Sequence, residues 1–126
     1  VPEQIGALRE ARADNWSVTV FPEGTTTDNR SLLPFKTSLL SLLEPPPPGV
    51  KVQPVMLDYG AAGEEIGWIG DESGANNARR VLARRGTFPV RIHFLEPFDP
   101  AEAGGRKAIG ARARAAIEPA LIEAVG

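Results

Sequence analysis

The stretch WSVTVFPEGTTT, residues 16–27, decides how this chain is organised. Residues 16–21 are rich in β-branched and aromatic side chains, which favours a β-strand, and Pro22 stops that pattern abruptly. Glycine and three hydroxyl side chains follow at once, as is typical of a tight loop. The stretch therefore predicts a strand that runs into a loop over residues 22–33.

Apolar spacing on both sides of this stretch predicts further helices and strands. The four prolines at 45–48 must end any preceding helix, and Asn76 or Asn77 is expected to cap a later one. Pro119 should kink or split the last helix. Residues 60–73 are expected to be mainly loop, with a possible short strand over 66–69. The helices are expected over residues 4–13, 35–43, 76–85 and 106–125, and the strands over residues 16–21, 50–57 and 88–95.

This alternation predicts an α/β fold in a single domain over residues 1–126. We expect a partial three-layer sandwich with a mixed, mostly parallel sheet flanked by helices. Such sheets are usually shielded on both faces and contain more than three or four strands. The thin sheet therefore leads to the expectation that further strands lie upstream of Val1.

Composition excludes several classes of site. The 126 residues include no cysteine, which rules out disulfides, thiolate zinc sites and iron–sulfur clusters within them. Residues 1–78 hold five basic and eleven acidic side chains, whereas residues 79–126 hold nine and five. The basic second half suits phosphates or an anionic lipid surface, but solvated helix faces are the preferred explanation, because charged stripes on amphipathic helices are common. Nucleic-acid binding is not supported, because the net charge is −2 and no aromatic residues alternate with the arginines.

The loop after the first predicted strand has the chemistry of an anion or polyol site. Gly24 permits a backbone turn, Thr25 and Thr26 offer hydroxyls, and Glu23 can accept hydrogen bonds from a ligand hydroxyl. Lys36 begins the next predicted helix, where a cation can meet the same ligand. The alternative is a plain loop and helix cap.

These residues also carry a family resemblance. The segments FPEGT (21–25), LPFK (33–36) and VQPV (52–55) resemble, in order and spacing, the third and fourth blocks of the glycerolipid acyltransferases, in particular 1-acyl-glycerol-3-phosphate (lysophosphatidic acid) O-acyltransferases. The resemblance implies that Glu23, Gly24 and Thr25 hold the glycerol phosphate acceptor and that Lys36 contacts its phosphate. Many members have arginine where this chain has Thr26, which favours lysophospholipids other than lysophosphatidic acid.

The catalytic block of that family, His-x4-Asp, is not in this chain. His93 is followed by Asp99, one residue too far away and on the wrong side of the acceptor block. His93 is therefore expected to be a structural histidine with satisfied ring nitrogens on a strand. The resemblance implies a dyad upstream of Val1, no catalytic residue within the chain, and no activity of these residues alone.

The implied reaction is the transfer of a fatty acyl group from acyl-CoA or acyl carrier protein to a lysophospholipid, in phospholipid biosynthesis. No cofactor besides that co-substrate and no metal is expected, and the parent protein is expected at the cytoplasmic face of a membrane. The acidic residues of the glycine-rich segment are expected to be solvated rather than to bind a cation. A non-catalytic module for phosphate or lipid headgroups remains an alternative, as does a structural lobe whose FPEGT loop only caps the sheet.

Overall fold

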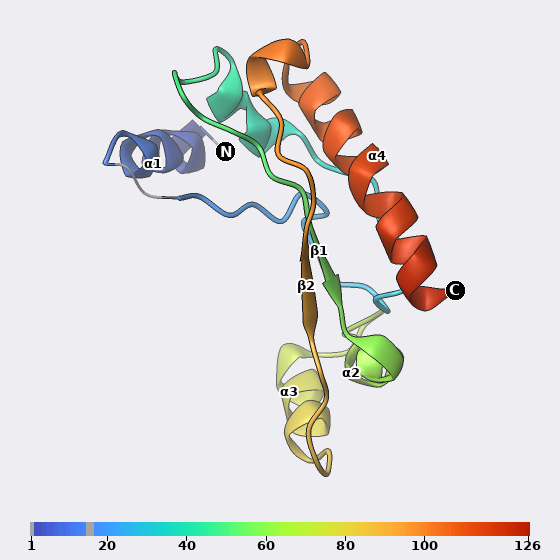
Figure 1. Ribbon diagram of the computed structural model, residues 1–126. Helices are drawn as coiled ribbons and strands as arrows, with labels where there is room; N and C mark the ends of the chain where they lie inside the picture. Colours follow the sequence, from blue (N-terminus) through green and yellow to red (C-terminus); the bar gives the residue numbers. More distant parts are fainter. Residues whose placement is uncertain (1, 15–16) are drawn as a thin grey trace.

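The computed structural model describes residues 2–14 and 17–126. A narrow two-stranded ribbon occupies the middle, with helices gathered at its two ends and one long helix beside it (Figure 1). Within this part of the chain the elements, in order, are α1 (Pro2–Ala13), the 3-10 helix η1 (Ser38–Leu43), β1 (Val55–Asp58), η2 (Gly60–Ala62), α2 (Gly63–Ile66), α3 (Gly74–Leu82), β2 (Arg91–Phe94), η3 (Pro100–Glu102) and α4 (Arg106–Val125).

The sheet overturns the predicted fold class. Strands β1 and β2 pair antiparallel, with Val55 opposite Phe94 and Asp58 opposite Arg91, and they form a two-stranded sheet. The partial three-layer sandwich with a mostly parallel sheet is therefore a wrong prediction. The physical reason lies in the connection between the strands. Helices α2 and α3 sit at one end of the ribbon (Figure 1), so the chain turns back beside β1 and does not cross over to run parallel to it.

None of the three predicted strands has its expected bounds, and the one expected over 88–95 is regular only over Arg91–Phe94. Residues 17–21 form no regular strand, and Trp16 lies outside the described residues. The strand expected over 50–57 is regular only from Val55, immediately after buried Pro54, while Val52 forms an isolated bridge with Phe98. β-Branched side chains favour a strand only where a neighbouring backbone completes the hydrogen-bond ladder, which explains the shortfall.

The helices follow the sequence more closely. Helix α4 has the predicted bounds, and Pro119 lies inside it without dividing it. Pro119 is exposed, so the carbonyl that loses its helical partner can be hydrated. The leucine-rich segment is a 3-10 helix and ends before the prolines as expected. Helix α3 starts earlier than predicted, because the hydroxyl of Ser73, rather than either asparagine, accepts the capping hydrogen bond. The short strand expected over 66–69 is absent, and α2 ends there.

Two apolar clusters hold the structure together. The first contains Leu42, Leu43, Phe98 and Ile109, and it joins η1 to the start of α4. The second contains Met56, Ile117 and Leu121, and Leu32 and Phe35 pack against it. Because Leu32 directly precedes the LPFK segment and Phe35 belongs to it, the second cluster anchors that segment to β1 and α4.

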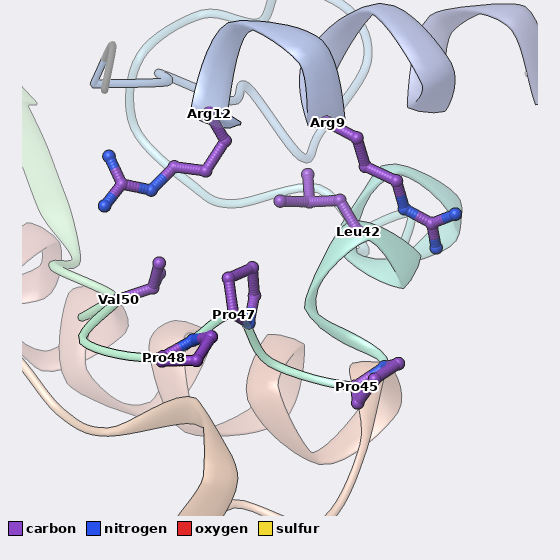
Figure 2. Close-up of a pocket in the computed structure, with 7 residues that line it drawn as sticks. All are labelled: Arg9, Arg12, Leu42, Pro45, Pro47, Pro48 and Val50. Atoms are coloured by element: carbon purple, nitrogen blue, oxygen red, sulfur yellow. The ribbon is translucent and has the colours of Figure 1, made fainter. Parts of the chain in front are cut away.

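A groove lies at the end of the molecule that carries α1. It has a volume of about 490 Å³, and α1 and the proline segment form its walls (Figure 2). The proline segment therefore shapes a surface as well as connecting η1 to β1. The residues that line the groove are Arg9, Arg12, Leu42, Pro45, Pro47, Pro48 and Val50.

Candidate functional site

The FPEGT and LPFK segments meet in the folded chain. The backbone N–H of Lys36 donates to the carbonyl of Pro22 over 2.7 Å, and the N–H of Gly24 closes a turn onto the carbonyl of Phe21 over 3.2 Å. Gly24 has φ +73°, a left-handed conformation that favours glycine over residues with a Cβ. Glycine at position 24 therefore permits the turn that brings the two segments together.

Glu23 ties the segments together with its side chain. Its carboxylate Oε2 accepts a hydrogen bond from the backbone N–H of Leu33 over 2.8 Å. A carboxylate that accepts from a backbone amide makes a strong, charge-assisted bond. Glu23 is half-buried, so the carboxylate remains reachable from solvent. The glutamate of the first segment therefore holds the second segment in place and can still accept a hydrogen bond from a ligand hydroxyl.

Lys36 lies directly over Gly24. A Cβ atom built on Gly24 would stand 3.2 Å from both Cδ and Nζ of Lys36. Thr25, the next residue, is exposed, as are Gly24 and Lys36. The arrangement therefore places a cation and a hydroxyl beside an open turn, which can bind a phosphate or another anionic group.

Thr26 differs from its neighbours. Its hydroxyl donates to the carbonyl of Trp68 over 2.7 Å, so it is engaged by the loop between α2 and α3. Glu23, Gly24, Thr25 and Lys36 thus lie together. The hydroxyl of Thr26 is instead bonded to the loop between α2 and α3. The role of these residues in binding a substrate remains a prediction.

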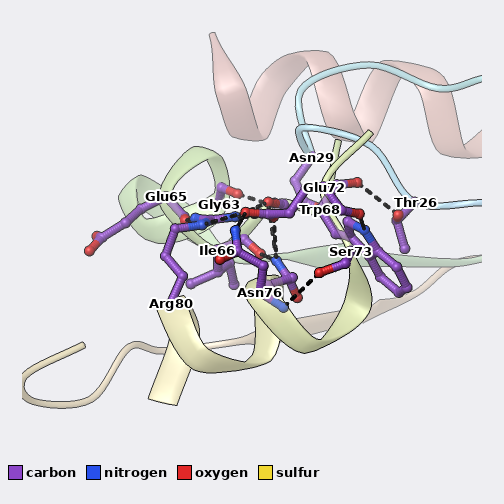
Figure 3. A network of polar contacts seen from close by, with 12 residues as sticks. Thr26, Asn29, Gly63, Glu65, Ile66, Trp68, Glu72, Ser73, Asn76 and Arg80 are labelled. Carbon is purple, nitrogen blue, oxygen red and sulfur yellow. Dashed lines mark hydrogen bonds and ion pairs between the residues drawn. The ribbon is translucent and has the colours of Figure 1, made fainter. Parts of the chain in front are cut away.

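A polar network on α2 and α3 supports the same loop (Figure 3). Arg80 binds Glu72 with two nitrogens, at 2.7 Å and 3.1 Å, and it also donates to the carbonyl of Gly67 over 2.7 Å. Asn29, which has φ +65°, donates to the carbonyl of Gly63 over 2.8 Å. The network therefore fixes the short segment that contacts Thr26 and Asn29.

The same network shifts two pKa values. Hydrogen bonding to Arg80 lowers the pKa of Glu72 below its usual value, and the carboxylate in turn raises the pKa of Arg80. Glu65 forms a further ion pair with Arg84 over 2.9 Å. Three of the acidic residues of the glycine-rich segment, Glu64, Glu65 and Glu72, are therefore paired with arginines, and Glu64 and Glu65 also remain exposed to solvent.

Sequence reasoning missed Arg114 on α4. Its guanidinium donates to the carbonyls of Leu33 and Leu32, and it lies 5.6 Å from the centre of the Phe35 ring. The sequence shows Arg114 only as one cation of a basic helix. A contact between residues 81 positions apart leaves no spacing signal that could have revealed it.

His93 lies on β2 as expected, but one of its ring nitrogens is not satisfied. Nε2 is buried without a hydrogen-bond partner, and the nearest carboxylate oxygen, Oδ2 of Asp58, stands 4.0 Å away. The expectation of a fully satisfied structural histidine is therefore wrong for this atom.

Comparison with known proteins identifies relatives. The model of the acyltransferase family matches residues 4–58, which contain both motif segments. Lyso-ornithine lipid O-acyltransferase of Rhodobacter capsulatus is 32% identical over 126 aligned positions, covering 94% of this chain and 45% of that protein. The Pseudomonas aeruginosa protein of the same name is 36% identical over 110 positions, covering 83% of this chain and 40% of that protein.

A second group of relatives comes from animals. Lysophosphatidylcholine acyltransferase 1 of Rattus norvegicus is 33% identical over 100 positions, covering 79% of this chain and 18% of that protein. The chain spans less than half of the length of these curated relatives. No solved structure matches. No helix in residues 2–14 or 17–126 has the length and apolar character needed to cross a bilayer.

The resemblance inferred from the motifs and the matched relatives agree. The matched range, residues 4–58, includes the turn at Gly24 and the segment that ends at Lys36, which the structure joins into one loop. Over residues 4–58 the chain is therefore similar to the acyltransferase family, and over most of its length it is similar to enzymes named for the acylation of lysolipids.

Proposed function

We propose that this chain forms the acceptor-binding part of a lysolipid acyltransferase. The reaction joins the free hydroxyl oxygen of a lysolipid to the acyl carbon of a thioester, while the carbon–sulfur bond breaks and the thiol leaves with the hydroxyl proton. The observation that carries the proposal is the joined loop, in which Lys36 covers Gly24 and Glu23 bonds to Leu33. Acyl-CoA or acyl carrier protein is proposed as donor and co-substrate, with no further cofactor.

The residues of the loop have separate roles in this proposal. Lys36 pairs with a negative charge of the acceptor headgroup, and the hydroxyl of Thr25 donates to an oxygen of the same group. Glu23 orients the acceptor through one of its hydroxyls. A base is also needed to remove the proton from the attacking hydroxyl, and in the family the histidine of His-x4-Asp supplies it. Since this chain lacks that block, binding and orientation are the roles that we assign to it, and we expect no transfer by these 126 residues alone.

The acceptor is proposed to be a lysophospholipid or a related lysolipid with a headgroup other than a bare phosphate. The loop has threonine where arginine is common in the family, and the Thr26 hydroxyl is held by Trp68. Arg30 forms an ion pair with Glu64 over 3.0 Å. The ammonium group of Lys36 lies over the turn at Gly24. The names of the relatives specify lyso-ornithine lipid and lysophosphatidylcholine as acceptors. A loop with less positive charge suits such acceptors better than lysophosphatidic acid.

Activity assays of the full-length protein test this proposal. Release of thiol from acyl-CoA is measured with a panel of lysolipids as acceptors. The variant Glu23→Ala is expected to lose roughly a hundredfold in rate while remaining folded, because a misplaced loop costs about that much in orientation. Glu123→Gln, at an exposed position of α4, serves as the control and should retain wild-type activity. Unchanged transfer by Glu23→Ala would contradict the site.

A non-catalytic headgroup-binding module is the second candidate. The exposed cation over the turn favours it, because that loop can bind an anionic headgroup without a catalytic base. It predicts binding of the protein to vesicles that contain lysolipid, weakened by Lys36→Met, without release of thiol from any acyl-CoA. Detectable transfer to a lysolipid would reject it.

Association with the cytoplasmic face of a membrane is proposed from the lipid substrate. Several arginines of the basic second half have internal partners, since Arg80 and Arg84 bind acidic residues and Arg112 lies 4.4 Å from the centre of the Phe98 ring. Co-sedimentation with anionic vesicles at low and high salt tests the proposal. Binding that decreases with salt would support an electrostatic contribution, and no binding at low salt would count against it.

A further inference from the structure

Arg114 and Glu23 hold the same residue of the acceptor loop, residues 22–36, from opposite sides. The N–H of Leu33 donates to Glu23 over 2.8 Å, while the carbonyl of Leu33 accepts from Nη1 of Arg114. Nη2 of Arg114 also reaches the carbonyl of Leu32, at 3.4 Å. The N–H and the carbonyl of Leu33 are therefore both bonded to charged side chains.

The surroundings of Arg114 restrict where its guanidinium can lie. Its side chain is 29% exposed, Glu118 one helical turn further on stands 3.3 Å away, and the Phe35 ring lies beneath it at 5.6 Å. Ile117 and Leu121 of the same helix belong to the cluster on which Leu32 and Phe35 pack. Helix α4 therefore presents a cation to the loop from a well-packed position, and Glu118 helps to orient it.

We propose that Arg114 is a positioning residue for the acceptor-binding loop, and this inference rests on the function proposed above. Arg114 does not contact the acceptor in this proposal. It sets the position of Leu33, and thereby of Lys36 three residues later, over the turn at Gly24. Arg114 lies outside residues 4–58, the segment that the family model matches, so the position of the loop depends on a distant part of the chain.

The shape of the guanidinium is essential to this role. Its planar fork can donate to two neighbouring carbonyls at once, whereas the ammonium group of lysine is a compact charge with no such geometry. Arg114→Lys keeps the charge and most of the contact with Phe35 but loses the paired donation. Arg112→Lys is the matched control, because Arg112 lies on the same helix and contacts the Phe98 ring, not the loop.

The first measurement is deuterium uptake by peptides that cover residues 30–37, in the full-length protein. Arg114→Lys is expected to exchange about tenfold faster there, with unchanged uptake around Met56, and Arg112→Lys should behave like wild type. Uptake around Met56 shows whether the variant is folded. Wild-type uptake over residues 30–37 in a folded Arg114→Lys protein would overturn the proposal.

The second measurement separates positioning from general stability. Arg114→Lys is expected to raise the KM for the lysolipid about tenfold, while kcat and the KM for the acyl donor stay within about twofold of wild type. Faster uptake with an unchanged KM for the lysolipid would also overturn the proposal. If the wild-type protein transfers no acyl group, the proposed function fails, and the uptake measurement alone decides whether Arg114 positions the loop.

Discussion

The two ends of the acceptor loop are held by different kinds of interaction. Leu32 and Phe35, near its C-terminal end, pack on Met56, Ile117 and Leu121. Near its N-terminal end, Thr26 and Asn29 are held by hydrogen bonds to backbone carbonyls, which a polar network on α2 and α3 fixes in place (Figure 3). The first anchor depends on apolar volume and the second on charge and hydrogen-bond geometry, so different perturbations should release each end.

The largest effect is expected at the apolar anchor. Ile117→Ala removes buried methyl groups and leaves a cavity beneath Phe35, which should lower the free energy of unfolding by about 2–5 kcal/mol. Ile122→Ala is the matched control, since Ile122 lies on the same helix but is 63% exposed. It should change the stability by no more than about 0.5 kcal/mol. Urea unfolding of both variants measures the difference, and equal losses would show that the cluster does not anchor the loop.

This apolar anchor was largely readable from the sequence. Ile117 and Leu121 of this anchor, and Ile109 of the other cluster, recur at helical spacing, and all three side chains are buried on α4 as the spacing predicts. The turn at Gly24 and the proximity of Lys36 were also readable, because the residues that form them are close in sequence. Local periodicity and turn chemistry survive in a single sequence.

The long-range polar contacts of the loop and the pairing of the sheet were not readable in the same way. Thr26 bonds to Trp68, and Arg114 reaches Leu33, over 42 and 81 positions respectively. No spacing rule predicts such partners. The pairing of Val55 with Phe94 is also long-range, and the helices between the strands suggested a parallel crossover instead. β-Propensity favours a strand over residues 17–21. A strand also needs a neighbouring backbone to pair with, and propensity does not predict that partner.

An intermediate effect is expected where the polar anchor touches the loop. A Cβ atom on Gly67 would stand 3.0 Å from the carbonyl oxygen of Thr27 and 3.2 Å from Cα of Asp28, and both are backbone atoms. Gly67→Ala should therefore displace the loop and cost about 1–3 kcal/mol. Its φ of −57° suits alanine, so the effect would come from the contact alone.

Gly6→Ala on α1 provides the control for that substitution. A Cβ at Gly6 meets nothing within 4 Å, and alanine should stabilise the helix by up to about 1 kcal/mol. Thermal unfolding and deuterium uptake over residues 24–30 measure both variants. A Gly67→Ala protein with wild-type stability and uptake would show that the loop is not confined by α2.

The smallest effect is expected from acid acting on Glu72 at the polar anchor. Because Arg80 lowers the pKa of Glu72 in the folded state, the ionised carboxylate stabilises the fold above its usual pKa of 4.5, and that contribution is lost as the pH falls through the lowered value. Glu72→Gln cannot lose a charge. Its deficit in stability relative to wild type should therefore be largest near neutral pH and shrink below pH 4.5. Thermal unfolding between pH 7 and pH 3 measures the difference, with Glu123→Gln as an exposed control. A constant deficit over that range would mean that the Arg80–Glu72 pair adds no pH-dependent stability, and the contrast between the two ends of the loop would then rest on packing and geometry alone.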